Sequence, residues 1–90
     1  MALIGMDVDQ VSQSANQINS QSGQLQTLIT QLTSTVNNLS SIWVGTDATT
    51  FVSTTWPTHK SNLDKCKADL DTLVTQLKQE IQQQTQTSAS

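Results

Sequence analysis

A seven-residue repeat of apolar positions runs through the first half of this chain and constrains the fold more than any other feature. The positions recur at alternating steps of three and four, the spacing that keeps one face of an α-helix against a partner helix. Ser22 is the only polar residue in the series, and it is small. The series comprises Val8, Val11, Ala15, Ile18, Ser22, Leu25, Ile29, Leu32, Val36, Leu39 and Trp43. It predicts one long helix, about 50 Å from Asp7 to Ser41.

The residues before this repeat carry the signals of a helix start. Asp7 is a candidate N-cap, because its carboxylate can accept from the free N–H groups of the first turn. Gln10 completes the capping-box spacing, and Met6 and Val11 occupy the two positions of a hydrophobic staple. The helix is also rich in Ser, Thr and Asn, which are mediocre helix formers. We therefore expect packing of its apolar seam to hold it in place.

A turn and a second apolar repeat follow. Gly45 marks the turn, since glycine reverses the backbone without steric penalty, and either Thr46 or Asp47 can cap the next helix. Pro57 predicts a kink near residues 53–56, or else a helix that begins at Pro57 after a looser segment. The second repeat comprises Val52, Trp56, His59, Leu63, Cys66, Leu70, Leu73 and Leu77, with Ala48, Phe51, Val74 and Ile81 alongside.

The sequence thus predicts an all-α fold, an antiparallel two-helix hairpin. We expect an N-terminal arm at 1–6, helix one at about 7–42, a turn at 43–46, helix two at about 47–81 and a flexible tail at 82–90. Two helices alone leave much of their apolar surface wet, so we expect hairpins to dimerise into a four-helix bundle. Residues expected in the core or dimer seam are Val11, Ile18, Leu25, Ile29, Leu32, Val36, Leu39, Phe51, Val52, Trp56, Leu63, Cys66, Leu70, Leu73 and Leu77.

Composition excludes several classes of function. The net charge of −3, with four Lys and no Arg, argues against nucleic acid as a partner. One Cys and one His cannot build a zinc site, and no apolar run is long enough to span a membrane. A membrane-active amphipathic hairpin is the weakest alternative, because the polar face lacks the basic residues that bind anionic lipid.

Catalytic chemistry is not expected either. His59 and Cys66 are seven residues apart on one helix, about 10 Å along its axis, whereas a nucleophile and its base need contact near about 3 Å. Cys66 falls on the predicted seam, where a buried inert thiol is the expected state. No triad, glycine-rich phosphate loop or paired carboxylates occur in the sequence, so we expect neither enzyme activity nor a cofactor.

The centre of the chain carries its most specific motif. Trp43 and Gly45 form a Trp-x-Gly motif between two helices of similar length in a chain of 90 residues. This arrangement resembles the WXG family of small helical hairpins handled by the type VII secretion system, and the resemblance covers essentially the whole chain. Ala48, Phe51 and Trp56 also resemble the loosely patterned positions that follow the motif in that family.

The resemblance implies antiparallel hairpins that pair as homodimers or heterodimers and leave the cytoplasm folded through an ATP-driven machine. It implies a role as secreted effector or as export partner, with the Trp-Gly turn lying next to the partner's C-terminal segment. Actinobacterial members often carry a C-terminal Tyr, three residues and then Asp or Glu. This chain has no Tyr, so its export signal takes another form or is supplied by a partner.

Two alternatives stay open at this point. The N-terminus has no basic region before its short apolar run, so we expect secretion without a cleaved signal peptide, from a cytoplasmic precursor. The alternative is a cytosolic coiled-coil adaptor that binds a helical segment of a larger protein. For the partner, we favour a homodimer over a heterodimer, because the seam contains no buried charge that enforces a foreign chain. Export of the folded protein distinguishes the two functions.

Overall fold

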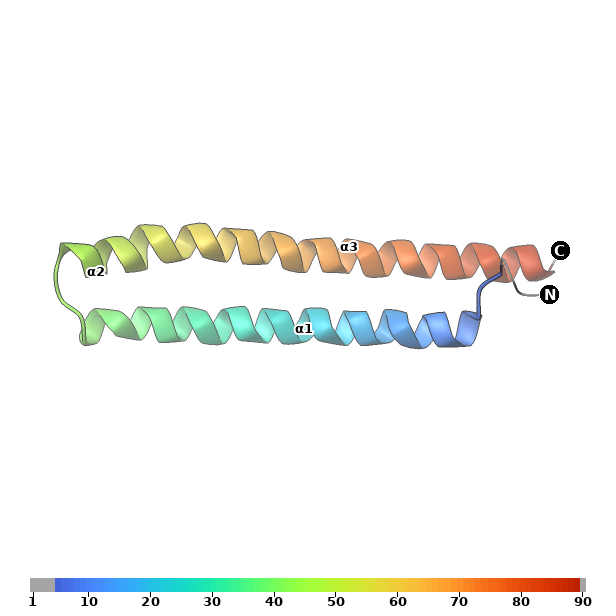
Figure 1. Cartoon of the computed structure of the whole chain (residues 1–90), viewed down its shortest axis with the longest axis horizontal. Helices are drawn as coiled ribbons and strands as arrows, with labels where there is room; N and C mark the ends of the chain where they lie inside the picture. Colours follow the sequence, from blue (N-terminus) through green and yellow to red (C-terminus); the bar gives the residue numbers. More distant parts are fainter. Residues whose placement is uncertain (1–4, 90) are drawn as a thin grey trace.

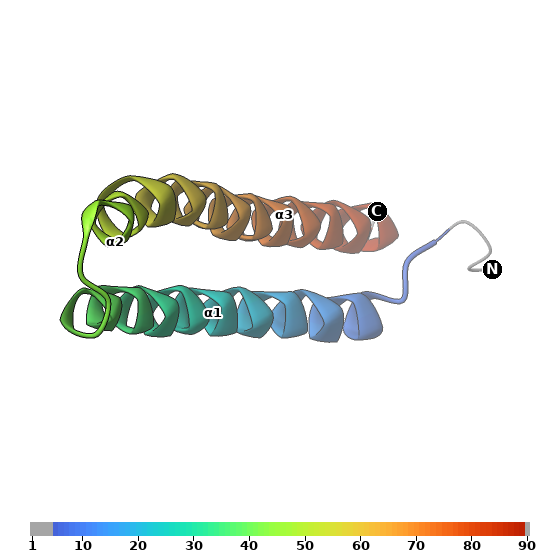
Figure 2. The same cartoon turned by 60° about the vertical axis from the view of Figure 1, so that its left-hand side comes forward.

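The chain forms a rod-shaped antiparallel helical hairpin (Figures 1 and 2). The computed structural model describes residues 5–89, with side chains through residue 86. Helix α1 spans Val8–Asn38 and ends in a 3-10 turn, η1, at Leu39–Ser41. Helix α2 (Thr46–Thr50), a π-helical turn η2 (Phe51–Thr55) and helix α3 (Trp56–Ala89) form the second arm. The rod measures 66 × 17 × 16 Å. The start of α1 and the end of α3 lie at the same end, opposite the turn.

The predicted start of the first helix is confirmed. Asp7 is the N-cap of α1, and its Oδ1 accepts a hydrogen bond of 3.1 Å from the backbone N–H of Gln10. At the other end, the N–H groups of Ile42 and Trp43 both donate to the carbonyl of Leu39. The first helical arm therefore ends beside Trp43, as the repeat predicted.

The π-helical turn η2 precedes Pro57 and resolves the question that this proline raised. The N–H of Trp56 donates to the carbonyl of Phe51, five residues earlier. Pro57 has no N–H to donate, so a wider turn before it accommodates the missing hydrogen bond without breaking the helix. The arm is helical on both sides of Pro57, so the alternative in which the helix first begins at Pro57 is wrong.

The predicted end of the second helix at Ile81 is also wrong, because α3 continues to Ala89. The segment expected to be a flexible tail starts with three Gln residues, which are good helix formers. The hydroxyl of Thr85 donates back to the carbonyl of Ile81 at 2.9 Å, and Ile81 and Gln84 are half-buried. Ser90 and residues 1–4 of the predicted N-terminal arm lie outside the described residues.

The core between α1 and α3 is narrow and follows the heptad repeat. On α1 it consists of every seventh residue: Ala15, Ser22, Ile29 and Val36 are buried. The flanking seam residues Val11, Ile18, Leu25 and Leu39 are half-buried. The hairpin thus buries one edge of the predicted seam and leaves the other edge partly open.

The inward face of α3 differs from the one the sequence suggested. Val74 is only 4% exposed, whereas its neighbour Leu73 is 46% exposed. The series that packs toward α1 is Trp56, Lys60, Leu63, Lys67, Leu70, Val74, Leu77 and Ile81, all buried or half-buried. His59 and Cys66 are exposed in the single hairpin, so Cys66 is not buried between α1 and α3 as its place in the repeat suggested. Lys60 and Lys67 can occupy inward positions because their aliphatic stems cover apolar surface while their ammonium groups reach carboxylates.

Candidate functional site

Gly45 makes the turn possible through its backbone conformation. Its φ and ψ are 137° and 177°, a region that is essentially reserved for glycine. A Cβ added at Gly45 would meet no heavy atom within 4 Å, so the constraint comes from the dihedral angles and not from space. The Gly45 carbonyl accepts from both the N–H and the hydroxyl of Thr49, and these bonds close the first turn of α2. The sequence prediction of a glycine-dependent turn at Gly45 agrees with this geometry.

Trp43 lies at the tip of the hairpin and is only partly covered by its own chain. Its ring packs against Phe51 with centroids 5.9 Å apart and ring planes tilted by 54°. The Trp43 side chain is nevertheless 41% exposed, and Val44 beside it is 90% exposed. Ile42 is also exposed. The tip therefore presents three consecutive apolar side chains to the surroundings, more than an isolated turn requires.

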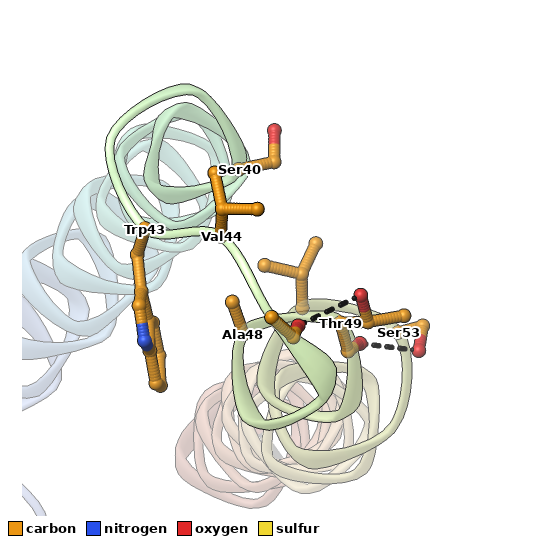
Figure 3. Close-up of a pocket in the computed structure, with 8 residues that line it drawn as sticks. Ser40, Trp43, Val44, Ala48, Thr49 and Ser53 are labelled. Carbon is orange, nitrogen blue, oxygen red and sulfur yellow. Dashed lines mark hydrogen bonds between the residues drawn. The ribbon is translucent and has the colours of Figure 1, made fainter.

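A groove of about 260 Å³ lies at this tip (Figure 3). Two hydroxyls in its wall turn back onto the backbone: Thr49 donates to the Gly45 carbonyl and Ser53 donates to the Thr49 carbonyl at 2.6 Å. With these hydroxyls engaged, the groove offers mainly apolar contact to whatever fills it. Its lining consists of Ser40, Trp43, Val44, Gly45, Ala48, Thr49, Val52 and Ser53.

A second apolar surface runs along one side of the rod. A helix turns by about 100° per residue. On α1, Leu28 and Leu32 therefore both project to one side of the plane that contains the axes of α1 and α3. The same step of about 100° per residue along the antiparallel α3 places Leu73 and Leu77 on that same side of the plane. Leu28, Leu32 and Leu73 are exposed large apolar residues. We call this surface the open face; it comprises Ile18, Leu25, Leu28, Leu32, Leu63, Cys66, Leu70, Leu73 and Leu77.

The opposite side of the rod is polar and carries the charged pairs. Lys60 binds Asp64 at 2.8 Å and Lys67 binds Asp71 at 2.6 Å, each pair four residues apart on α3. Asp71 also accepts a hydrogen bond of 2.7 Å from the hydroxyl of Ser22 on α1. The hydrogen bonds from Lys67 and then from Ser22 hold the pKa of Asp71 below its ordinary value, because both stabilise the carboxylate.

The residues predicted for the seam fall into three groups. Ile29 and Val36 are buried between the helices, whereas Leu32, Cys66 and Leu73 are exposed on the open face. The remainder are half-buried: Val11, Ile18, Leu25, Leu39, Phe51, Val52, Trp56, Leu63, Leu70 and Leu77. The indole Nε1 of Trp56 is buried and has no hydrogen-bond partner among the described side chains and backbone.

Sequence reasoning placed Val74 only alongside the second repeat and did not predict the contact between Asp71 and Ser22. Ser22 was visible as the polar exception in the repeat, and a polar exception in a seam signals a polar partner on the facing helix. The apolar repeats gave Asp71 no place in the seam. The signal that could have identified it is its position between Leu70 and Val74, at the edge of the inward series.

Residues 5–89 contain no group of three or more His, Cys, Asp or Glu side chains placed to hold a metal ion. No helix in this range combines the length and the apolarity needed to cross a bilayer.

Comparison with known proteins decides the family. The family model described as "Proteins of 100 residues with WXG" matches residues 3–87, which include the Trp43–Gly45 turn and both long helices. The chain belongs to the WXG family. Members of the WXG family are small non-enzymatic helical proteins, typically of the type VII secretion system. No curated protein and no solved structure matches the chain.

Proposed function

We propose that this WXG hairpin acts by pairing through its open face, with a second copy as the favoured partner, and is exported folded by a type VII machine. It serves there as a secreted effector or as the export partner of another protein. The observation that carries the proposal is the one-sided distribution of exposed leucines: Leu28, Leu32 and Leu73 lie along one flank of the rod. A monomer gains nothing from such a stripe, whereas a four-helix bundle buries it.

Charge supports a second copy as the partner. Between Gln10 and Asp47 the chain has no charged side chain, so two α1 helices can approach each other without repulsion. The charged pairs Lys60–Asp64 and Lys67–Asp71 lie on the opposite flank, and they stay in water when the open face is covered. A heterodimer with another hairpin uses the same face and is the competing arrangement.

The tip supports a recognition role at the end of the bundle. Trp43 and Val44 keep apolar surface exposed where the rod ends, next to a groove of about 260 Å³. In an antiparallel dimer this tip lies beside the ends of the partner's helices, so one surface is formed from both chains. Such a composite surface forms only when two chains are paired, so recognition of this surface selects the dimer.

An export assay separates this proposal from a cytosolic adaptor. The protein is produced in a bacterium with an active type VII system, and its abundance in the medium is compared with that in a strain without the system's ATPase. We expect system-dependent accumulation of folded protein, with a cytoplasmic enzyme as the lysis control. Retention in the cells at full solubility, with a larger helical protein bound, supports the adaptor instead.

A further inference from the structure

Helix α3 carries two overlapping apolar series, and the hairpin uses the less apolar one. The inward series includes Lys60, Lys67 and Val74, whereas the outward series one residue earlier contains His59, Cys66 and Leu73. Rotating α3 about its own axis until the outward series faces α1 would bury Cys66 and Leu73 against α1. The same rotation would move the two lysines of the inward series into solvent. Apolar burial alone favours that turned arrangement. Some other interaction must hold α3 in the rotation that the structure shows.

The Ser22–Asp71 hydrogen bond is the interaction placed to do this. Ser22 is 1% exposed, so its hydroxyl has no access to water and depends on Asp71 for a partner. Within residues 5–86, it is the only side-chain hydrogen bond that joins α1 to α3; the other side-chain bonds span three or four residues. Lys67 holds the second carboxylate oxygen of Asp71 at 2.6 Å and fixes its orientation.

The neighbouring heptad supplies an internal comparison. Lys60 and Asp64 form the same pair as Lys67 and Asp71, one heptad earlier on α3. No bond links Asp64 to α1 among the described residues, and the α1 position one heptad after Ser22 is the buried Ile29. The lysine–aspartate pair therefore recurs, whereas the bond across the hairpin is made only where α1 places a serine.

We propose that Ser22 and Asp71 are positioning residues for the partner surface. Their bond sets the rotation of α3 about its axis, which keeps Cys66 and Leu73 on the open face and available to a second hairpin. In a turned α3, Ser22 loses Asp71 and remains as a buried hydroxyl without a partner. The bond thereby makes the rotation that closes the open face unfavourable. The inference rests on the open face being the pairing surface, as proposed above.

The test uses the single thiol as a reporter of the rotation of α3. Cys66 is exposed in the hairpin, so a maleimide labels it readily in protein diluted to the monomer. In Ser22→Ala, we expect labelling of Cys66 to slow about threefold or more and the dimer dissociation constant to rise about tenfold, at unchanged helicity by circular dichroism. Ser22→Ala changes no charge, so a slower reaction reports accessibility. Ser22→Thr keeps the hydroxyl and is expected to restore both values.

The aspartates provide the matched controls. Asp71→Ala removes the bond from the other side, and the Ser22→Ala/Asp71→Ala double variant is expected to pair no more weakly than either single variant. Asp64→Ala removes an equivalent lysine partner without touching Ser22, and it is expected to pair as the wild type does. If Ser22→Ala is poorly helical, the dimer dissociation constant of Asp71→Ala is compared with that of the wild type instead, because Asp71 is half-exposed and its removal disturbs the core less.

Two results overturn the inference. One is unchanged Cys66 labelling and unchanged pairing in a helical Ser22→Ala protein. The other is equal weakening by Asp64→Ala and Asp71→Ala, which assigns the effect to charge on α3. Failure of the proposed dimer has a different signature: the wild type then stays monomeric at all concentrations, and the labelling of Cys66 in that monomer still reports whether Ser22 sets the rotation.

Discussion

The hydroxyl of Ser22 on α1 donates to Asp71 on α3 across 2.7 Å, at a sequence separation of 49 residues. Ser22 occupies the same heptad position as the buried Ala15, Ile29 and Val36. An apolar residue at this position would leave the two helices free to choose among several rotations and registers. A single polar contact within an apolar seam restricts that choice, as polar residues at core positions do in coiled coils.

The ionisation of Asp71 predicts that the thermal stability of the protein depends on pH in the acid range. Lys67 and Ser22 lower the folded-state pKa of Asp71, so its stabilising contribution is present above the unfolded-state pKa of about 3.9 and is lost as the pH falls through the folded value. Between about pH 5 and about pH 2, the Tm of the wild type should fall more than that of Asp71→Asn. Thermal melts followed by circular dichroism measure this. Ser22→Ala removes one of the two hydrogen bonds to Asp71, so the fall in its Tm should lie between those of the wild type and Asp71→Asn. The same dependence of Tm on pH in all three proteins contradicts this prediction.

Gly45 and Gly23 predict substitutions of opposite sign. Gly45 has a φ of 137°, so Gly45→Ala should destabilise the hairpin by about 1–3 kcal/mol through backbone strain. Gly23 lies in the interior of α1 with nothing within 4 Å of a Cβ, so Gly23→Ala should stabilise the protein by about 0.5–1 kcal/mol. Chemical denaturation of the two variants measures both. A neutral Gly45→Ala shows that the turn does not need its glycine conformation.

The partial exposure of Trp43 predicts that its truncation affects recognition more than folding. The ring contacts Phe51 but is 41% exposed, so Trp43→Ala should cost about 1–2 kcal/mol, below the range of about 3–5 kcal/mol for a fully buried aromatic. Denaturation measures the stability, and accumulation in the medium measures export, which we expect to be lost. Trp43→Phe keeps an aromatic contact and should preserve stability. A large loss of stability in Trp43→Ala instead identifies Trp43 as a core residue.

The open face predicts that a charge introduced at Leu73 separates the two chains. Leu73→Glu should raise the dimer dissociation constant about tenfold or more, because the charge would be buried between hairpins without a partner. Helicity of the dilute monomer should be unchanged, since Leu73 is already exposed in the single hairpin. Thr75→Glu places the same charge on the opposite flank of α3 and is expected to pair normally. Sedimentation at a series of concentrations measures both, and equal effects of the two variants argue against the open face.

Sequence reasoning predicted the hairpin because its signals are local and repeated. The capping residue Asp7, the turn glycine Gly45 and the heptad series from Val8 each report on neighbouring residues only. The π-helical turn before Pro57 was anticipated as an irregularity, although its type depends on how the backbone redistributes one missing hydrogen bond. The extension of α3 to Ala89 was missed, because a run of Gln, Thr and Ser has no apolar repeat to indicate a helix.

The rotation of α3 could not be obtained from periodicity alone. The series through His59, Cys66 and Leu73 is more apolar than the series through Lys60, Lys67 and Val74, so hydrophobicity ranks them in the wrong order. The choice depends on a pairwise contact between Ser22 and Asp71, which are distant in sequence. Surface that must remain open to a partner also looks like core in a single sequence, which explains why Leu73 was assigned to the seam.

The central claim is that the open face pairs two hairpins, and the absolute mass of the purified protein tests it most directly. Light scattering is recorded while the protein is diluted through the micromolar range, with helicity measured on the same samples. We predict a helical species of twice the 9.8 kDa chain mass that dissociates on dilution. A well-folded helical protein that stays at the mass of one chain throughout contradicts the claim.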